Sequence, residues 1–335
     1  MDTLMHMSNV SSRERIASSE VQDGQSAHTP TLAYLGPEGT FAEAALRVMA
    51  PEARGLPCAS IPAAMEAVRS GEADGAVVPL ENSLEGAITV TLDEFAWGEH
   101  LLITGELLLP VKFSLLAREG TELAHIKRVI SHPAAITQCR GFLARELPDA
   151  VVISAASTAG AARDVAEPGS PYDAAIADPI AAEHYGLIEV ASNIGDRSDT
   201  VTRFVRVERP GRPLPEPTGA DRTSMVAFLK DDHPGALLEM LSEFMVRGIN
   251  LTRIESRPTG DGIGRYFFHF DCEGHIAEAR VGDALAGLHR ICADLRFLGS
   301  YPRADAVAPK IKPGTTDEAF AEAADWLSRM RSGQI

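Results

Sequence analysis

A hydroxyl and a guanidinium stand side by side at Thr202 and Arg203, in the stretch GDRSDTVTRFVRV from Gly195 to Val207. A planar guanidinium can bind an anion through paired hydrogen bonds, and a hydroxyl can hydrogen-bond an oxygen atom. Turn-forming residues precede the pair and β-branched or aromatic residues follow it, which predicts a loop leading into a strand. Neighbouring side chains on a strand point to opposite faces unless a bulge or the loop redirects one. For the pair alone, a backbone-bonded threonine and a surface ion pair are the commoner arrangement.

Other polar side chains follow expected strands of an α/β fold. Asn82 and Ser83 come directly after a buried strand at 75–80. Open α/β sheets bind ligands at such strand ends, although both residues could instead cap the next helix. Ser131 follows another strand, and Gln138 lies about two turns along the next helix, where it could face a cleft or solvent. We expect these residues to converge on Thr202.

Two α/β units are expected, joined by extended segments. The apolar run Leu101–Ala117 is long enough for one strand that crosses between the units, and Val201–Val207 returns as a second crossing. The glycine loop Gly36–Thr40 leads into a helix with Thr40 as its N-cap. The loop could bind an anion or could be an ordinary turn between a strand and a helix. His132 precedes a helix with proline in its first turn. It could cap that helix, pack in the core or contact a ligand. This arrangement resembles the hinged cleft of periplasmic binding proteins.

A proline-rich linker, Arg209–Gly219, separates these units from a C-terminal part. Beyond it, strands and helices are expected in the order βαββαβ within about eighty residues, which is the ferredoxin-like arrangement. The tail from Ala304 is polar, with a possible helix at 317–330.

Composition indicates a globular protein of more than one domain. The chain has 335 residues, with 45% hydrophobic and 23% charged residues. A formal net charge of −16 argues against nucleic acid or an anionic membrane as a partner. The four cysteines (Cys58, Cys139, Cys272 and Cys292) form no CxxC pair, so neither a zinc site nor a disulfide framework is indicated. We expect reduced thiols, a cytoplasmic location and a disordered leader at residues 1–30 without a secretory signal.

Six motifs together resemble the bacterial prephenate dehydratases, from about Thr31 to Arg303. They are YLGPEGTF at 34–41, VPLENSLEG at 78–86, SHPAAITQC at 131–139, TRFV at 202–205, GALL at 235–238 and ESRP at 255–258. The resemblance implies a catalytic domain at 31–208 with two lobes, 31–107 with 200–208 and 108–199. A linker at 209–221, an ACT regulatory domain at 222–303 and a tail at 304–335 would follow.

Site residues follow from the same resemblance. Thr202 corresponds to the family's catalytic threonine and Arg203 to its substrate anchor. The substrate pocket would include Asn82, Ser83, Ser131, Gln138 and Phe204. Phenylalanine, the expected allosteric effector, would bind between two ACT domains of a homodimer or homotetramer. Its residues would be Gly235, Ala236, Leu237, Leu238, Asn250, Leu251, Glu255, Ser256, Arg257 and Pro258.

The implied reaction is the decarboxylating dehydration of prephenate to phenylpyruvate, with no metal or organic cofactor. Two alternatives stay open. Asp199–Val201 precede TRF where the family has an Asn-rich approach, so the aminated relative arogenate could be the substrate. A non-catalytic amino-acid sensor could use the same cleft and the same ACT module.

Overall fold

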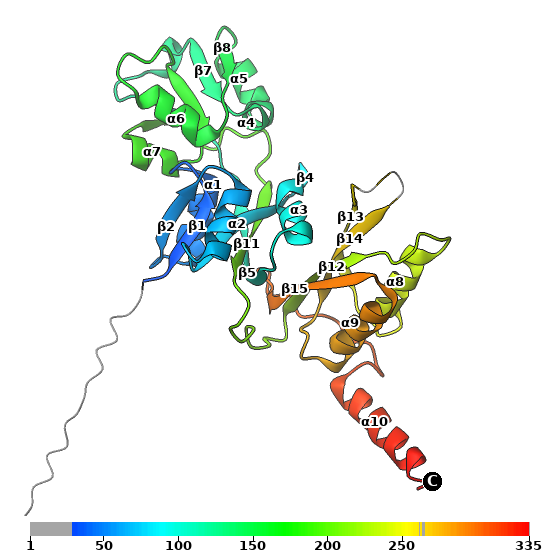
Figure 1. Cartoon of the computed structure of the whole chain (residues 1–335). Coiled ribbons are helices and arrows are strands. Elements are labelled where there is room, and N and C mark those ends of the chain that lie inside the picture. Colours follow the sequence, from blue (N-terminus) through cyan, green and yellow to red (C-terminus); the bar gives the residue numbers. More distant parts are fainter. Residues whose placement is uncertain (1–28, 261, 263–264, 335) are drawn as a thin grey trace, which may run out of the picture.

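The computed structural model describes residues 29–334 except 261, 263 and 264. The leader expected at 1–30 therefore lies almost wholly outside the described residues. Figure 1 shows two α/β lobes, a further sheet covered by helices and a separate C-terminal helix. Within the described residues, no helix is both long enough and apolar enough to cross a membrane.

Lobe 1 is a mixed sheet in the order β2-β1-β3-β11-β5, and β4 pairs with the end of β3. Strands β1 to β3 are parallel, whereas β11 returns late in the chain and lies antiparallel between β3 and β5. One face of the sheet packs on α1 and the other on α2 and α3. The elements of lobe 1 are β1 (Thr31–Leu35), α1 (Phe41–Met49), β2 (Arg54–Cys58), α2 (Ile61–Ser70), β3 (Gly75–Asn82), β4 (Gly86–Ala87), α3 (Thr89–Trp97), β5 (Leu102–Pro110) and β11 (Val201–Glu208).

Side-chain caps fix where the first helices of lobe 1 begin. The Thr40 hydroxyl accepts a hydrogen bond from the Glu43 amide, and the Ser60 hydroxyl accepts one from the Ala63 amide. Each cap satisfies an amide that lacks a partner in the first helical turn. The N-cap role predicted for Thr40 is confirmed.

Lobe 2 is a second sheet in the order β10-β6-β9-β7-β8. Its strands are short and rich in alanine, valine and isoleucine, and helices cover both faces. Cys139 divides the helical segment at 133–146 into two short helices. The elements of lobe 2 are β6 (Ser114–Ala117), η1 (Leu123–His125), β7 (Arg128–Ser131), α4 (Pro133–Gln138), α5 (Arg140–Glu146), β8 (Val151–Ser154), α6 (Thr158–Ala166), β9 (Ala174–Ala177), α7 (Ile180–Tyr185) and β10 (Ile188–Ala191).

The lobes are connected by two chain segments. Residues 111–113 connect β5 to β6. The prediction of a single strand at Leu101–Ala117 is therefore wrong, because the segment forms two strands in different sheets. Pro110 cannot donate to a ladder, which is consistent with β5 ending there. The Val111 amide donates to the Thr200 carbonyl, and therefore the outgoing and returning segments run together.

The C-terminal module, Asp221–Pro302, is an antiparallel sheet in the order β13-β14-β12-β15 with two helices. Its elements are β12 (Asp221–Phe228), α8 (Ala236–Met245), β13 (Leu251–Pro258), β14 (Tyr266–Glu273), α9 (Ala279–Ile291) and β15 (Asp294–Pro302). This order confirms the predicted ferredoxin-like βαββαβ arrangement. The helices α8 and α9 cover one face of the sheet and bury a core that includes Met240, Phe244 and Phe270.

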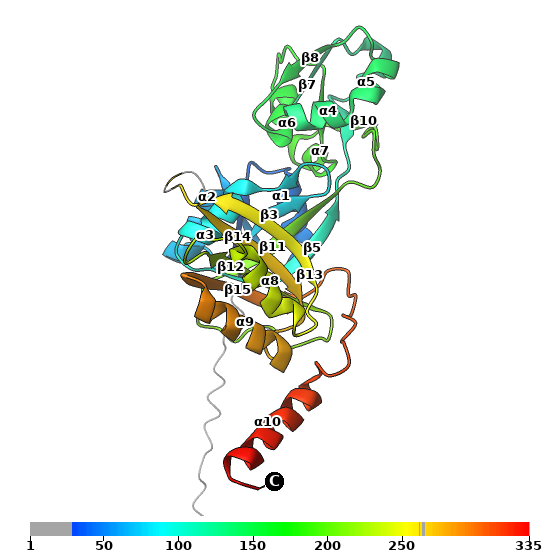
Figure 2. The ribbon, with the colours of Figure 1, turned by 90° about the vertical axis from the view of Figure 1, so that its right-hand side faces the viewer.

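The other face of the C-terminal module packs against lobe 1. Val226, Phe267, Leu298 and Tyr301 belong to the same buried cluster as Ile103 of β5 and other residues of lobe 1. Figure 2 shows the sheet of the module lying over lobe 1, with α8 and α9 on the face that is turned away from lobe 1. The two parts therefore share one hydrophobic core. The helix α10 (Asp317–Arg331) buries none of its residues.

Candidate active site in the cleft between the lobes

A cleft of about 1130 Å³ lies between the two lobes. Residues from the carboxyl ends of β1, β2 and β3 line it on one side, and the loops before α4 and α6 line it on the other. Such strand ends are where open α/β sheets bind ligands. Its polar and aromatic lining includes Glu38, Thr40, Phe41, Asn82, Glu85, Phe113, His132, Gln138, Ser157, Thr158, Arg163, Asp164, Tyr185, Thr202 and Phe204.

Thr202 and Asn82 form a hydrogen-bonded pair in the cleft wall. They are cross-strand partners on β11 and β3, and Asn82 Nδ2 donates to Thr202 Oγ1 at 2.9 Å. Asn82 Oδ1 accepts from the amides of Leu84 and Glu85, which fixes the amide orientation. Because Thr202 Oγ1 accepts from Asn82, its own proton can be donated to another group.

Gln138 reaches the cleft from lobe 2. It lies at the end of α4, and its Nε2 donates to Glu85 Oε1 of lobe 1 at 3.1 Å. His132 caps the same helix, where its Nδ1 accepts from the Ala134 amide at 3.3 Å. The side chain of Gln138 therefore bridges the two lobes at the cleft.

A second set of contacts joins the lobes through α1 and α7. Glu43 Oε1 lies 2.8 Å from His184 Nε2, and Arg47 pairs with Glu183 at 3.2 Å. Burial would raise the pKa of Glu43, but the Gly39 amide and His184 lower it below its ordinary value. The Glu43 carboxylate is thus held in its charged form at the junction.

Among the described residues that line the cleft, Arg163 is the only lysine or arginine. It lies on α6, whose N-cap Ser157 and first residue Thr158 also line the cleft. Its nearest ion-pair partner is Asp164, at 3.6 Å, and its side chain is more than half exposed. The guanidinium is therefore available to an anionic ligand.

Arg203 does not face the cleft, in contrast to its expected role as substrate anchor. Alternation along β11 places Thr202 and Phe204 on the cleft side and Arg203 on the opposite side. Arg203 is only 5% exposed, and it donates to Glu106 of β5, Asp271 of β14 and Tyr301 of β15. Phe204 lines the cleft and also belongs to the buried hydrophobic cluster between the sheet and α1.

Two serines expected in the pocket have structural contacts instead. Ser131 is fully buried, and its hydroxyl donates to the Ile176 carbonyl within the sheet of lobe 2. The Ser83 hydroxyl accepts from the Val201 amide at 3.0 Å and so holds the start of β11. Neither residue lines the cleft. The structure therefore does not bring either hydroxyl to the cleft lining, and their contact with substrate stays a prediction.

Comparison with known proteins identifies the family of this fold and cleft. The sequence model "Prephenate dehydratase" matches residues 32–212, and the model "ACT domain" matches residues 224–290. A prephenate dehydratase of Amycolatopsis methanolica is 49% identical over 304 residues, covering 90% of this chain and 98% of the relative. The chain belongs to the prephenate dehydratase family.

Solved structures agree with this family assignment. A prephenate dehydratase from Arthrobacter aurescens, solved in complex with L-Phe, is 50% identical with a TM-score of 0.86. The match covers 90% of this chain and 99% of the chain from Arthrobacter aurescens. GqqA, described as a novel type of quorum quenching acylase, is 32% identical with a TM-score of 0.73, covering 81% and 97% of the two chains.

The effector residues expected for the family lie at two places in the C-terminal module. Gly235 precedes α8 with φ of 95°, a left-handed conformation that favours glycine, and Leu237 and Leu238 are exposed on the helix. The β13 residues alternate between half-buried and exposed along the sheet edge. Arg257 among them makes a bidentate ion pair with Asp93 of α3.

Sequence reasoning missed several residues of the family's cleft, above all Arg163, Thr158 and Glu85. Arg163 and Thr158 belong to the element after β8, a strand parallel to β7 whose carboxyl end faces the cleft. The strand-end rule that selected Asn82 could have selected Thr158 as well. No group of His, Cys, Asp or Glu suited to a metal occurs among the described residues.

Proposed function

We propose that this protein is a prephenate dehydratase whose reaction takes place in the cleft at Thr202. The observation that carries the proposal is the Thr202–Asn82 pair, which brings the TRF and ENS motifs together in one wall of the cleft. Membership of the family over nearly the whole chain supports it.

Prephenate carries two carboxylates and a ring hydroxyl, and the reaction releases carbon dioxide and water. Loss of the ring carboxylate provides the electron pair, and departure of the hydroxyl group with one proton completes the aromatic ring. The protein must hold the dianion and assist the departing oxygen. The reaction as proposed needs neither metal nor organic cofactor.

Thr202 is placed to assist the departing oxygen. A threonine hydroxyl is too weak an acid to give up its proton outright, so stabilisation by a hydrogen bond is its role. Donation from Asn82 polarises the Thr202 hydroxyl and strengthens the bond that it donates in turn.

The charge of the substrate is met by lobe 2 rather than by Arg203. Arg163 and the hydroxyls of Ser157 and Thr158 line the cleft on the side opposite Thr202. Glu38, Glu85 and Asp164 also line the cleft, so the attraction for a dianion depends on Arg163 and on backbone amides. Gln138 would orient the substrate between the lobes.

L-Phenylalanine is proposed as the allosteric effector of the C-terminal module. The support is the L-Phe complex of the relative that is 50% identical, together with the GALL and ESRP motifs. We place the effector between two modules of a cytoplasmic homodimer or homotetramer, near Leu237, Leu238, Asn250 and the run 255–258. Phenylalanine is the amino acid made from the reaction product, so inhibition would limit its own synthesis.

The deciding experiment is an assay of the purified protein with prephenate and, separately, with arogenate. We expect phenylpyruvate from prephenate at a kcat at least tenfold above any turnover of arogenate. Thr202→Ala should lower kcat by about a hundred to ten thousand fold with little change in KM. An inactive wild type, or a Thr202→Ala variant with near-normal turnover, would refute the proposal for this cleft.

A further inference from the structure

Two neighbouring residue pairs connect the cleft to the C-terminal module. Thr202 pairs with Asn82 across β11 and β3, and the next residues, Arg203 and Glu81, pair in the same register. Alternation places the first pair on the cleft side and the second pair on the opposite side. The ladder is irregular immediately beyond them, because the pairing of β11 with β3 skips Leu80.

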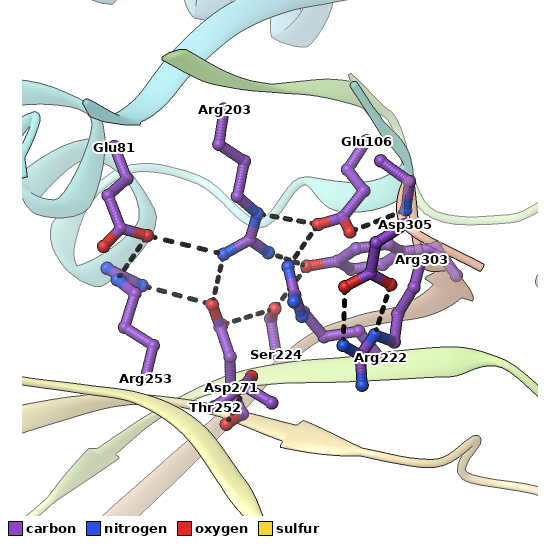
Figure 3. A network of polar contacts seen from close by, with 12 residues as sticks. Glu81, Glu106, Arg203, Arg222, Ser224, Thr252, Arg253, Asp271, Arg303 and Asp305 are labelled. Carbon is purple, nitrogen blue, oxygen red and sulfur yellow. Dashed lines mark hydrogen bonds and ion pairs between the residues drawn. The ribbon is translucent and has the colours of Figure 1, made fainter. Parts of the chain in front are cut away.

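Buried polar side chains of the C-terminal module hydrogen-bond Arg203. Arg203 Nη1 donates to Asp271 Oδ2 at 2.5 Å, and its Nη2 donates to the Tyr301 hydroxyl at 2.8 Å. Figure 3 shows Asp271 between Arg203 and Arg253, with Ser224 donating to its second oxygen. Asp271 is only 1% exposed. A buried, hydrogen-bonded carboxylate of this kind constrains the direction of the guanidinium.

The electrostatics of this cluster keep the Asp271 carboxyl charged. Burial alone would raise the pKa of the Asp271 carboxyl, but Arg203, Arg253 and Arg222 outweigh burial and hold it well below its usual range. Glu106 of β5 accepts from both Arg203 and Arg222 at 2.6 Å, which adds a second bridge between the parts. The Asp271 carboxyl therefore stays ionised at any pH at which the enzyme would work.

Arg253 carries the connection on to β13. Its Nη1 lies 3.5 Å from Asp271 Oδ2, and its Nε lies 3.9 Å from Glu81 Oε2. Its Nε and Nη2 are buried without hydrogen-bond partners among the described residues. Such an incompletely bonded arginine is more easily shifted than Arg203, whose three nitrogens all donate. The residues proposed to bind the effector flank Arg253 on the same strand.

We propose that Arg203 is a positioning residue through which Asp271 and Arg253 of the C-terminal module set the place of the Thr202 hydroxyl. A shift of β13 or β14 would move Arg203 and Glu81, and with them the adjoining Thr202 and Asn82. The inference rests on the proposed function and extends it to a regulatory connection within one chain. A double-mutant cycle measures the energetic coupling between such residues.

A double-mutant cycle on kcat with prephenate tests the positioning role. Asp271→Asn keeps the shape of the side chain and removes its charge, and we expect kcat to fall by about tenfold or more. In a Thr202→Ala background the same substitution should lower kcat less than twofold, because the hydroxyl that it misplaces is already absent. Equal factors in the two backgrounds would show a general structural effect and overturn the proposal.

Glu81→Gln is the variant to use should Asp271→Asn fail to fold. The Glu81 side chain is 41% exposed, so its substitution leaves little buried charge unpaired. We expect a several-fold fall in kcat in the wild-type background only, with KM for prephenate within twofold of wild type. Arg296→Gln is the matched control, because Arg296 joins β15 to the carbonyls of Ala96 and Gly98 outside this cluster. Its kcat should equal that of wild type.

The response to L-phenylalanine gives a second measurement. In Arg253→Gln, we expect calorimetry to show that L-phenylalanine still binds while its effect on kcat/KM falls at least fivefold, because the variant lacks the charged contact that joins β13 to Asp271. A full response in Arg253→Gln would exclude β13 from the connection. The dehydratase activity of the wild type is measured before that of any variant. Its absence would contradict the proposed function rather than this connection.

Discussion

At the scale of single residues, the cleft separates the group proposed to assist the reaction from the group proposed to bind the charged substrate. Thr202 lies in a wall of lobe 1, whereas Arg163 projects from α6 of lobe 2. A dianionic substrate would therefore be held from one lobe and acted on from the other. Binding and catalysis should then respond to different substitutions.

Arg163→Gln tests this separation. Loss of one charge-assisted hydrogen bond costs about 1.5–3 kcal/mol, so KM for prephenate should rise by roughly tenfold or more. The same contact is present before and during reaction, and hence kcat should change less than threefold. Arg145→Gln is the control, because Arg145 lies on α5 of the same lobe and pairs with Glu146 away from the cleft. Equal KM values for the two variants would contradict the role of Arg163.

The fate of Arg203 shows where sequence reasoning succeeded and where it failed. Strand alternation places adjacent side chains on opposite faces, and the structure follows that rule for Thr202 and Arg203. The expectation carried over from the family put both residues in one pocket. The deciding partner, Asp271, lies 68 residues further along the chain in another domain, and no local pattern reveals it. Motif and register thus located Thr202 and Asn82 but could not assign Arg203.

At the scale of elements, strands with a clear pattern could be predicted and strands without one could not. The return strand predicted at Val201–Val207 is found at Val201–Glu208, and the βαββαβ order predicted beyond the linker is confirmed. The strand β2 was missed, because Arg54–Cys58 contains glycine and proline and shows no alternation. The sequence predicts one strand where the structure has β5 and β6, since an apolar run does not reveal which of two sheets each part joins.

Gly299 of β15 is required where the C-terminal module meets lobe 1. It has a φ of 135°, and a Cβ there would collide with the Ile103 carbonyl of β5. Gly299→Ala should therefore lower the free energy of unfolding by about 1–3 kcal/mol, measured by urea denaturation. Gly105→Ala on β5 is the matched control, because its nearest neighbour is Met49 Cε at 3.8 Å. A Gly299→Ala variant as stable as Gly105→Ala would show that β15 can move away without cost.

At the scale of the whole molecule, one buried histidine should make stability depend on pH. Burial, with Arg253 and Arg257 nearby, lowers the pKa of His269 to about 3, against an ordinary value of 6.5. Between these pH values the unfolded chain binds a proton that the folded chain does not, so stability falls as pH is lowered through this range. Asp271 has a lowered pKa and loses its contribution only below its ordinary value of 3.8.

The variant His269→Asn should therefore lose less stability than wild type when pH is lowered from 7 to 4.5. The slope removed is at most about 1.4 kcal/mol per pH unit, which is the limit for one proton. Unfolding free energies from urea at pH 7, 5.5 and 4.5 measure it. Other titrating groups, such as Asp178 with a pKa raised by burial to about 6, contribute equally to both proteins and cancel. Parallel curves for variant and wild type would exclude His269 as the source.

Removal of residues 219–335 tests how far the catalytic lobes depend on the rest of the chain. Feedback by L-phenylalanine should be abolished, because the proposed effector residues are deleted. The Thr202–Asn82 pair and Arg163 lie wholly within the lobes, so part of kcat should remain. Deletion also removes Asp271 from Arg203 and uncovers Ile103 and its apolar neighbours, and therefore kcat and solubility should both fall.

A shorter truncation supplies the comparison for this experiment. Ending the chain after Thr315 deletes α10, which buries no residue, and leaves the C-terminal module in place. That protein should keep wild-type kcat and a full response to L-phenylalanine, measured in the same assay. Because the shared core joins the module to lobe 1, the loss in kcat on the longer deletion should exceed that of Asp271→Asn. A longer deletion with unchanged kcat would show that the lobes position Thr202 without help from the module.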